Sequence, residues 1–568
     1  MNTKTLRISC AQLSFPVGAI QDNKDKIINT LKEAEKVHSD IVLFPELALT
    51  GYPPEDLLLR ESFVGKNFAV MEEIAEFSGK TSGVIGFVDR SLKKQKNDNV
   101  DRDIANAAAI VQNGDVKGIY HKCFLPNYSV FDEARYFDKG TDPSTLFWYE
   151  DIAVGINICE DIWIEDGPAE EQVKKGASII LNINASPFDL NKINQRKEKV
   201  KNKAKKLGVP IIYLNMVGGQ DELVFDGGSF VVDKNGEIIY MARQFEEDFF
   251  TIDIELDVKD IISESNLYLN DKKVELKPLV STKELDKIES MYAALKLGLS
   301  DYVTKNKFNN VLVGLSGGID SALTATIACD ALTPDHVIGV AMPSKYNPDS
   351  SLDDAKQLAK NLGIKIKEIS IEDTVEDIRT LISENIEQQL KSVVDENIQS
   401  RVRGNLLMAL SNQLNAMVVS TGNKSEMAVG YATLYGDLVG GFALLKDVYK
   451  ADVYNLAKYR NSISDVIPQN TIDKEPSAEL SENQFDSDSL PNYDILDKII
   501  KLYIEEDYSS EKIINSGIDK DVVYDVLEKI DRNEYKRNQV APGVKLTNRA
   551  FGKDRRMPIT NTYKRERN

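Results

Sequence analysis

The 568-residue sequence predicts an α/β protein of two successive domains. At roughly 150 residues per domain, this length suits two to four domains. Short apolar runs alternate with segments of helical periodicity in both halves of the chain. A charged, weakly periodic stretch at 257–287, which contains Pro278, separates the halves and is typical of a linker. We predict domains at 1–262 and 286–568 that are joined by a linker at 263–285.

The first half contains the alternating strands and helices of an α/β domain. A strand is predicted at 6–10, and the segment 23–37 repeats apolar residues at helical spacing. A hairpin with polar turn residues follows at 230–240, and a strand at 249–256 closes this half. Other apolar runs of strand length lie at 41–44, 84–88, 107–111, 152–158, 179–183 and 209–214.

The second half begins with a predicted helix at 282–304 and continues as another α/β series. The polar segment 470–492 is expected to form a long loop, and the basic tail 555–568 is expected on the surface. Strands are predicted at 311–313, 337–341 and 416–419, and helices at 322–331 and 351–362.

The charge balance disfavours several classes of function. The chain has 70 basic and 90 acidic residues, a formal net charge of −20, which opposes general binding to nucleic acid or anionic lipid. No apolar run approaches the roughly 18 residues of a membrane helix, and the first residues lack a secretory apolar segment. We therefore expect a cytoplasmic protein with small-molecule substrates that binds neither nucleic acid nor membrane.

The cysteines and histidines limit the possible chemistry. Cys10, Cys123, Cys159 and Cys329 are scattered without a CxxC pair, which predicts neither a disulfide framework nor a zinc site. Only 3 histidines are present and none lies in an HExxH pattern, so histidine-based catalysis is nearly excluded. We expect Cys10, Cys123 and Cys329 to be small buried residues.

The most specific motif is GLSGGIDS, which lies between an apolar strand and a helix. Glycines let the backbone approach a ligand, and the serines and helix N–H groups can bind phosphate oxygens. The motif is neither a Walker A loop nor a GxGxxG turn, and an ordinary glycine-rich turn is the alternative. Its residues are Gly314, Leu315, Ser316, Gly317, Gly318, Ile319, Asp320 and Ser321.

This loop resembles the pyrophosphate-binding loop of ATP pyrophosphatases, which adenylylate an oxygen by cleaving ATP between its α and β phosphates. Within that superfamily, the chain after residue 283 resembles the NAD synthetases. The motifs that carry this resemblance are AMPS at 341–344, NIQSRVR at 397–403, TGNKSE at 421–426, GY at 430–431, YGD at 435–437, VYK at 448–450, PSAEL at 476–480 and EYKR at 534–537.

The resemblance implies a Rossmann-like parallel sheet of the adenine nucleotide alpha-hydrolase type. It also implies that nicotinic acid adenine dinucleotide (deamido-NAD) is adenylylated on its carboxylate and then attacked by ammonia. The triphosphate requires Mg²⁺, a cation that prefers carboxylate and phosphate oxygens. Asp320 and Glu426 match the metal-binding acids of the family, and Thr421, Lys450 and Ser477 match positions that contact ATP.

The same resemblance places the dinucleotide site. Asn397, Arg401 and Lys536, together with Glu426, match positions that contact deamido-NAD. For each basic residue, a solvated surface charge is the alternative interpretation. Ammonia-dependent relatives often carry a lysine before the YGD motif where this chain has Leu434, so we expect the nicotinate side to be recognised differently.

Three reactive side chains in the first half each follow a predicted strand. Glu46 follows the run at 41–44, Lys122 follows the run 116–120, and Cys159 ends the strand 152–158. Residues at strand ends can share one pocket at a sheet edge. A thiol that attacks an amide needs a base, a group that stabilises the oxyanion and an acid for the leaving ammonia. Cys159, Lys122 and Glu46 can supply these without a histidine.

The contexts of these residues, FPEL at 44–47, YHKCFLP at 120–126, NICEDIW at 157–163 and NASPF at 184–188, resemble the nitrilase superfamily over about 6–257. That resemblance implies a four-layer α-β-β-α sandwich. In the glutaminase branch it also implies that Tyr128, Ser186 and Lys192 bind glutamine, although some relatives have arginine where Lys192 stands.

The two halves together predict an enzyme whose first domain releases ammonia from glutamine and whose second domain consumes it to form NAD. Free ammonia at neutral pH is mostly ammonium, so a protected passage is expected. By analogy with both families we expect a homo-oligomer of at least two chains.

Three alternatives differ from this prediction in class. A tRNA-modifying pyrophosphatase would share the loop, but the net charge of −20 and the lack of CxxC disfavour it. GMP and asparagine synthetases also share the loop, but they carry different glutaminase domains. An inactive amidase serving as an oligomerisation scaffold is disfavoured because Glu46, Lys122 and Cys159 are all present.

Overall fold

The computed structural model describes residues 2–91, 103–258, 267–270, 273–386 and 389–563. It divides into two compact units. Unit 1 comprises 1–220 and 224–285, and unit 2 comprises 221–223 and 286–568. None of the helices in the described part of the chain combines the length and the apolar character that crossing a membrane requires.

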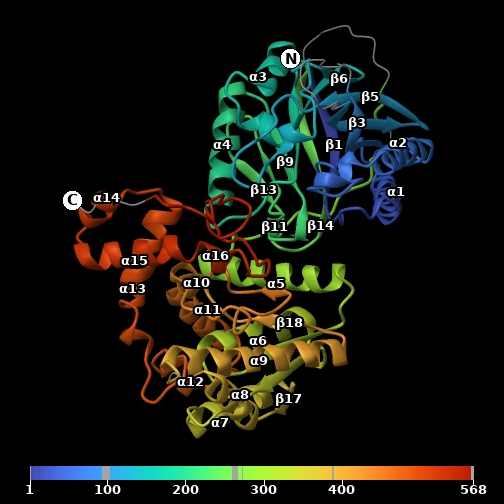
Figure 1. The fold of residues 1–568 in the computed structure, drawn as a ribbon. Helices are drawn as coiled ribbons and strands as arrows, with labels where there is room; N and C mark the ends of the chain where they lie inside the picture. Colours follow the sequence, from blue (N-terminus) through green and yellow to red (C-terminus); the bar gives the residue numbers. More distant parts are fainter. Residues whose placement is uncertain (1, 92–102, 259–266, 271–272, 387–388, 564–568) are drawn as a thin grey trace. The chain divides into compact units, whose positions relative to one another are not determined.

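Unit 1 is a four-layer sandwich of two sheets between two pairs of helices (Figure 1). The first sheet has the order β14-β1-β2-β3-β4-β5 and the second the order β13-β12-β9-β8-β7-β6. The strands of the first sheet are β14 (Asp248–Val258), β1 (Asn2–Gln12), β2 (Ile41–Leu43), β3 (Ser82–Arg90), β4 (Ile104–Gln112) and β5 (Asp115–His121). Those of the second are β13 (Ile238–Met241), β12 (Phe230–Val232), β9 (Ile211–Asn215), β8 (Ile179–Asn184), β7 (Ile152–Ile158) and β6 (Leu146–Tyr149).

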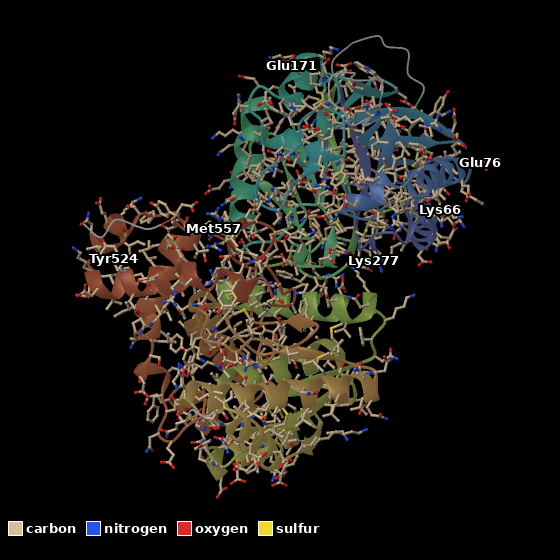
Figure 2. All side chains as sticks on the ribbon, viewed as in Figure 1. Lys66, Glu76, Glu171, Lys277, Tyr524 and Met557 are labelled. Atoms are coloured by element: carbon tan, nitrogen blue, oxygen red, sulfur yellow. The ribbon has the colours of Figure 1, made fainter. Side chains whose placement is uncertain are left out.

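Alternating side chains build the layers of unit 1. Leu6 and Ile8 of β1 pack with Val154 and Ile156 of β7 in the core between the sheets. The opposite face of the first sheet packs on α1 (Ile20–Lys36) and α2 (Glu61–Glu76), whose polar sides carry charged residues such as Lys66 and Glu76 outward (Figure 2). The second sheet packs on α3 (Pro168–Lys174) and α4 (Lys192–Leu207). A two-stranded ribbon, β10 (Val217–Gln220) with β11 (Leu223–Asp226), completes the strands.

Unit 2 contains a five-stranded parallel sheet with the order β17-β16-β15-β18-β19. Leu312 of β15 packs with α8 (Glu372–Asn385) and α9 (Ser392–Leu414), while its buried neighbours Val311 and Val313 lie on the opposite face. On that face α6 (Ile319–Leu332) contacts β15 and β16 and is covered by α5 (Lys287–Lys305) and α11 (Lys450–Ile463). The strands are β15 (Asn310–Gly314), β16 (Val337–Ala341), β17 (Lys365–Glu368), β18 (Ala416–Ser420) and β19 (Phe442–Ala443).

A second apolar cluster in unit 2 joins helices near the C-terminus to α10 (Lys424–Val429). The remaining helices are α7 (Asp349–Leu362), α12 (Gln469–Asp473), α13 (Tyr493–Ile500), α14 (Ser510–Ile514), α15 (Lys520–Arg532) and α16 (Glu534–Arg537).

The predicted fold class is confirmed, and some element limits differ from the prediction. The helix predicted at 282–304 begins only at Lys287, because Asp286 accepts hydrogen bonds from the backbone N–H groups of Ile288 and Glu289 and so caps it. The polar segment 470–492, predicted as one loop, includes the end of α12 and a 3₁₀ turn at Asp486–Asp488.

The predicted linker packs on unit 1 where the structure describes it. The backbone of Tyr268 exchanges hydrogen bonds with the Gln112 side chain, and the Thr282 N–H donates to the Met241 carbonyl. Residues 263–266 and 271–272 lie outside the described residues. The predicted domain limits stay a prediction.

Candidate active sites

The first candidate site lies in unit 1, where loops that follow three strands meet. Glu46 follows β2, Lys122 follows β5, and Cys159 begins a 3₁₀ helix at Cys159–Trp163 (η3) directly after β7. The turn that carries Glu46 crosses β3 at Gly86, where an added Cβ would lie 2.3 Å from the Pro45 carbonyl oxygen. Glycine is therefore required there for the close approach of the two backbones.

A buried lysine connects two carboxylates in this site. Lys122 Nζ donates to Glu46 Oε1 at 2.7 Å and to Glu133 Oε1 and Oε2 at 2.9 and 2.8 Å. Both carboxylates have further donors: Asn106 Nδ2 and the Ala185 N–H bind Glu46 at 2.8 and 3.0 Å, and the Tyr52 hydroxyl binds Glu133 at 2.9 Å. A charge pair that is buried away from water keeps a fixed geometry only when further hydrogen bonds satisfy its remaining donors and acceptors.

Burial and charge shift the pKa values of this cluster. Burial raises the pKa of the Cys159 thiol well above its usual value, and Glu46 raises it further, whereas Lys122 acts against both. Burial lowers the pKa of Lys122, but the charges of Glu133 and Glu46 outweigh that effect and raise it overall. Burial raises the pKa of Glu133 to about 7. The resting site thus holds a protonated thiol beside an ammonium.

Asp161 joins the loop of Lys122 to the turn of Cys159. Its Oδ1 accepts the N–H groups of Cys123 and Phe124 at 3.1 and 3.0 Å, and its Oδ2 accepts the Ile158 N–H and the Tyr120 hydroxyl at 3.1 and 2.9 Å. Cys159 has a φ of 44°, in the left-handed region, which these contacts help to maintain.

The three residues predicted to bind glutamine make different contacts in unit 1. Tyr128 is half exposed, and its hydroxyl donates to Glu160 Oε2 at 3.0 Å. Lys192, at the start of α4, places Nζ 4.8 Å from the ring centre of Trp163, and burial lowers its pKa. Ser186 is buried, and its hydroxyl accepts a hydrogen bond from Arg196 Nε at 3.2 Å.

Sequence reasoning missed Glu133, Glu160 and Asp161 in unit 1. Glu133 lies in a 3₁₀ turn at Glu133–Arg135 rather than at a strand end, so it carried no positional signal. Glu160 and Asp161 directly follow Cys159, and that adjacency was a signal that could have identified them.

The second candidate site lies in unit 2, at the carboxyl edge of the parallel sheet. The loop Gly314–Ser321 joins β15 to α6, and Thr421 follows the neighbouring strand β18. Gly317 has a φ of 80°, and a Cβ there would lie 2.3 Å from the Ser351 carbonyl oxygen, so the position requires glycine. The Ser316 and Ser321 hydroxyls lie 3.2 Å apart, and the Gly318 N–H donates to Ser316 Oγ at 3.2 Å.

Two carboxylates and one lysine meet beside this loop. Lys450, the first residue of α11, donates through Nζ to Asp320 Oδ2 at 2.6 Å and to Glu426 Oε1 at 3.1 Å. Asn423 binds both acids, because its Nδ2 donates to Asp320 Oδ1 at 2.8 Å and its Oδ1 accepts the Glu426 N–H at 3.0 Å. Burial raises the pKa of Glu426 to about 7.

Three of the four residues predicted to contact deamido-NAD converge on the segment 430–434, and the fourth, Glu426, pairs with Lys450. Asn397 Oδ1 accepts from the Thr433 hydroxyl at 2.8 Å, and Arg401 Nε donates to the Leu434 carbonyl at 3.2 Å. Lys536 Nζ donates to the carbonyls of Gly430 and Ala432 at 2.8 and 2.9 Å. The Leu434 side chain packs with Met427, Leu438 and Ala443.

Ser477 is the predicted ATP residue with the least direct connection to the loop. Its hydroxyl hydrogen-bonds to the Gln484 carbonyl within its own segment. The next acid, Glu479, accepts from Ser351 Oγ at 2.8 Å, and Ser351 borders Gly317.

Comparisons with known proteins agree with this division of sites. Residues 7–263 match the carbon-nitrogen hydrolase family, and residues 291–540 match the NAD synthase family. The glutamine-dependent NAD(+) synthetase of Thermotoga maritima is 45% identical over 585 residues, with 99% of each chain covered. That of Aquifex aeolicus is also 45% identical and covers 98% of this chain and 100% of the relative.

Solved structures give the same result. A glutamine-dependent NAD+ synthetase from Acinetobacter baumannii in complex with adenosine diphosphate has a TM-score of 0.74 and 40% identity, with 98% of this chain and 99% of that chain covered. The chain therefore belongs to the family of glutamine-dependent NAD(+) synthetases, which are ligases.

Proposed function

We propose that this ligase hydrolyses glutamine at Cys159 and uses the ammonia to amidate deamido-NAD through an adenylylated intermediate. The observation that carries the first half is Lys122, buried between Glu46 and Glu133 in the pocket of Cys159. The observation that carries the second half is the loop Gly314–Ser321, which places backbone N–H groups and two serines beside a pair of carboxylates.

In the first reaction Glu46 removes the proton of the Cys159 thiol as the sulfur attacks the side-chain carbonyl carbon of glutamine. The raised pKa of the thiol makes this base necessary. Lys122 stabilises the oxyanion of the tetrahedral intermediate. Glu46 returns the proton to the departing nitrogen, and ammonia leaves. A water molecule that Glu46 activates then hydrolyses the thioester and releases glutamate.

The charges around Cys159 suit glutamine better than a simple amide. Free glutamine carries an α-ammonium and an α-carboxylate, and Glu160 and Lys192, which lie outside the Lys122 cluster, offer one charge of each sign to match them. Glu160 and Lys192 both act on the Cys159 environment, and Tyr128 holds Glu160 through a hydrogen bond of 3.0 Å. We assign the ammonium of glutamine to Glu160 and Tyr128, and its carboxylate to Lys192 and Ser186.

In the second reaction the nicotinate carboxylate of deamido-NAD attacks the α-phosphorus of ATP, and pyrophosphate leaves. A carboxylate is a poor electrophile, and AMP gives it a leaving group. The N–H groups and hydroxyls of Gly314–Ser321 bind the departing phosphates, with Thr421, Lys450 and Ser477 as further ATP contacts. Ammonia then attacks the acyl carbon and displaces AMP.

The donor chemistry of Asp320 and Glu426 suits Mg²⁺, because their oxygens already converge on one cation, the Lys450 ammonium. When bound, Mg²⁺ would neutralise the charge that develops on the phosphates of ATP. Asn397, Arg401 and Lys536, with Glu426, would hold the dinucleotide beside this site.

A labelling experiment tests the whole proposal. The enzyme is supplied with ATP, Mg²⁺, deamido-NAD and glutamine labelled with ¹⁵N in its amide, and the products are analysed by mass spectrometry. We expect ¹⁵N in the carboxamide of NAD, with AMP and pyrophosphate in equal amounts. Formation of ADP and phosphate would contradict the adenylylated intermediate, and unlabelled NAD would contradict the use of glutamine nitrogen.

A further inference from the structure

Lys450 occupies the place between the two carboxylates that a metal ion would need. Its Nζ lies 2.6 Å from Asp320 Oδ2 and 3.1 Å from Glu426 Oε1, and its side chain is only 4% exposed. The second oxygen of Asp320 is bound by Asn423, which also orients Glu426. One ammonium group is thus the cation on which both acids converge.

Aromatic and backbone contacts hold the lysine in this position. The Nζ atom lies 5.3 Å from the ring centre of Tyr493, within the range of a cation–π interaction. The Tyr493 hydroxyl donates to Asp486 Oδ2 at 2.7 Å, which fixes the orientation of the ring. The Lys450 N–H donates to Ser425 Oγ at 2.9 Å, so the start of α11 is also fixed.

The charges in this arrangement oppose the entry of a free divalent cation. Lys450 contributes a positive charge that Asp320 and Glu426 already share. A metal ion bound to the same two oxygens would lie in contact with the ammonium, and the two cations would repel each other. ATP changes this balance, because its phosphate oxygens offer the ammonium a new anionic partner.

The protein also offers too few ligands for a metal by itself. Among the described residues, no group of three or more histidine, cysteine, aspartate or glutamate side chains is arranged to hold a metal ion. Mg²⁺ is commonly bound by one or two carboxylates together with substrate phosphates and water. Water, or the triphosphate when it is bound, would therefore complete the coordination.

We propose that Lys450 acts as a resident cation, which pairs Asp320 with Glu426 in the nucleotide-free enzyme and keeps divalent metal out until nucleotide arrives. The metal then binds only together with ATP, as the ammonium moves from the carboxylates to the phosphates. This inference rests on the proposed ATP and metal function of the same site, and it adds the order in which nucleotide and metal bind.

Binding of Mn²⁺ to the full-length protein, followed by the electron paramagnetic resonance signal of free Mn²⁺, tests the proposal. Without nucleotide, Lys450→Met should bind one Mn²⁺ at least tenfold more tightly than the wild type. The chain carries a net charge of −20, so surface carboxylates will bind some Mn²⁺ in every sample. The double variant Lys450→Met/Asp320→Asn removes the proposed site alone and should return to the wild-type level.

Nucleotide provides the second arm of the experiment. The α,β-methylene analogue of ATP resists cleavage between its α and β phosphates, and with it the wild type should bind Mn²⁺ tightly, beyond what the same concentration of analogue binds without protein. If the analogue produces no such binding, the proposed ATP and metal function fails. If the analogue does produce it, but the nucleotide-free wild type already binds Mn²⁺ as tightly as Lys450→Met, the resident-cation proposal is overturned and the proposed function stands.

The wild type decides the question even if Lys450→Met does not fold. Nucleotide-free wild type and Asp320→Asn should then take up Mn²⁺ equally, because Asp320 is already paired with the lysine. A stronger, Asp320-dependent uptake by the wild type would overturn the proposal.

Discussion

Lys122 donates hydrogen bonds to both carboxylate oxygens of Glu133, at 2.9 and 2.8 Å, and both side chains are buried. This pair affects the chemistry of Glu46, the third member of the cluster. If Glu133 did not neutralise the ammonium, the charge of Lys122 would fall on Glu46 alone. Glu133 therefore shares the ammonium with Glu46 and holds Lys122 between the two carboxylates.

Replacing Glu133 with glutamine tests this relationship. Glu133→Gln keeps the shape of the side chain but leaves Glu46 as the sole anionic partner of Lys122, so the ammonium is no longer held between two carboxylates at the place proposed for the oxyanion. We expect glutamine hydrolysis to fall by about a hundredfold. Synthesis from ammonium salt should stay near the wild-type rate, which also controls for folding. A hydrolysis rate within twofold of the wild type would contradict the role of Glu133.

The pH dependence of glutamine hydrolysis should report the same carboxyl group. Burial raises the pKa of Glu133 to about 7, so acidification through that pH protonates it and removes its charge from Lys122. We expect the initial rate of hydrolysis to fall as the pH decreases through about 7, and this fall should be absent in Glu133→Gln.

Unfolding of the protein at acidic pH does not explain such a fall in the hydrolysis rate, because the pKa of Glu133 is shifted upwards in the folded protein. The folded protein binds the Glu133 proton more tightly than an unfolded chain, in which the pKa is near its ordinary value of 4.5. The contribution of this group to stability therefore increases as the pH falls from about 7 towards 4.5. A melting temperature that followed the activity downwards would contradict this explanation.

Cys159→Ala should separate the two reactions. The variant lacks the atom proposed to bond the glutamine carbonyl, so glutamine-supported synthesis should disappear. Synthesis from ammonium salt should persist and should increase with pH as the fraction of neutral ammonia rises. Glu46→Gln and Lys122→Ala should give the same separation, because the three residues act as one unit.

Cys123 is the alternative nucleophile if Cys159→Ala still uses glutamine. Burial, with the charge of Asp161, raises the pKa of the Cys123 thiol to about 12, and its Sγ contacts the His121 carbonyl at 3.5 Å. Both features oppose thiolate formation. The matched variant Cys123→Ala should therefore hydrolyse glutamine at nearly the wild-type rate, and a large loss would contradict the assignment of Cys159.

Removing one of the two acids proposed to bind metal should have the opposite effect to Cys159→Ala. Glu426→Gln or Asp320→Asn removes a charge from the proposed metal and triphosphate site, and we expect synthesis to fall by at least about a hundredfold with either nitrogen source. Glutamine hydrolysis should persist at least in part. Synthesis near the wild-type rate in Glu426→Gln would show that this position does not serve the metal.

Asp161 should matter for both stability and hydrolysis. Asp161→Ala leaves the four donors that it accepts without their partner in a buried region, and we expect the free energy of unfolding to fall by about 3 kcal/mol. The Cys159 turn should lose its fixed geometry, so hydrolysis should fall more than ammonia-dependent synthesis. Urea unfolding measures the first effect, and unchanged stability would contradict it.

Local sequence patterns predicted the parts of the sites that lie next to strands. The carboxyl end of an apolar run is a position that the chain itself marks, and Glu46, Lys122, Cys159 and the loop Gly314–Ser321 all occupy such positions. Turn chemistry is local only in part: glycine permits the left-handed φ of Gly317, but the Ser351 carbonyl oxygen, 2.3 Å from where a Cβ would lie, is brought there by tertiary packing. The fold class followed from the same alternation of strands and helices.

Tertiary structure decided which distant side chains join these local features. Glu133 reaches Lys122 from a 3₁₀ turn, and Tyr493 reaches Lys450 from the start of α13. Asp486, which lies in the segment predicted as a polar loop, binds the Tyr493 hydroxyl. Neither contact is marked by a regular residue spacing in the sequence, because both depend on how irregular loops pack against one another. By itself the sequence thus determined which reactive groups lie at the ends of strands. Packing determined which charges surround these groups, and hence their protonation and pairing.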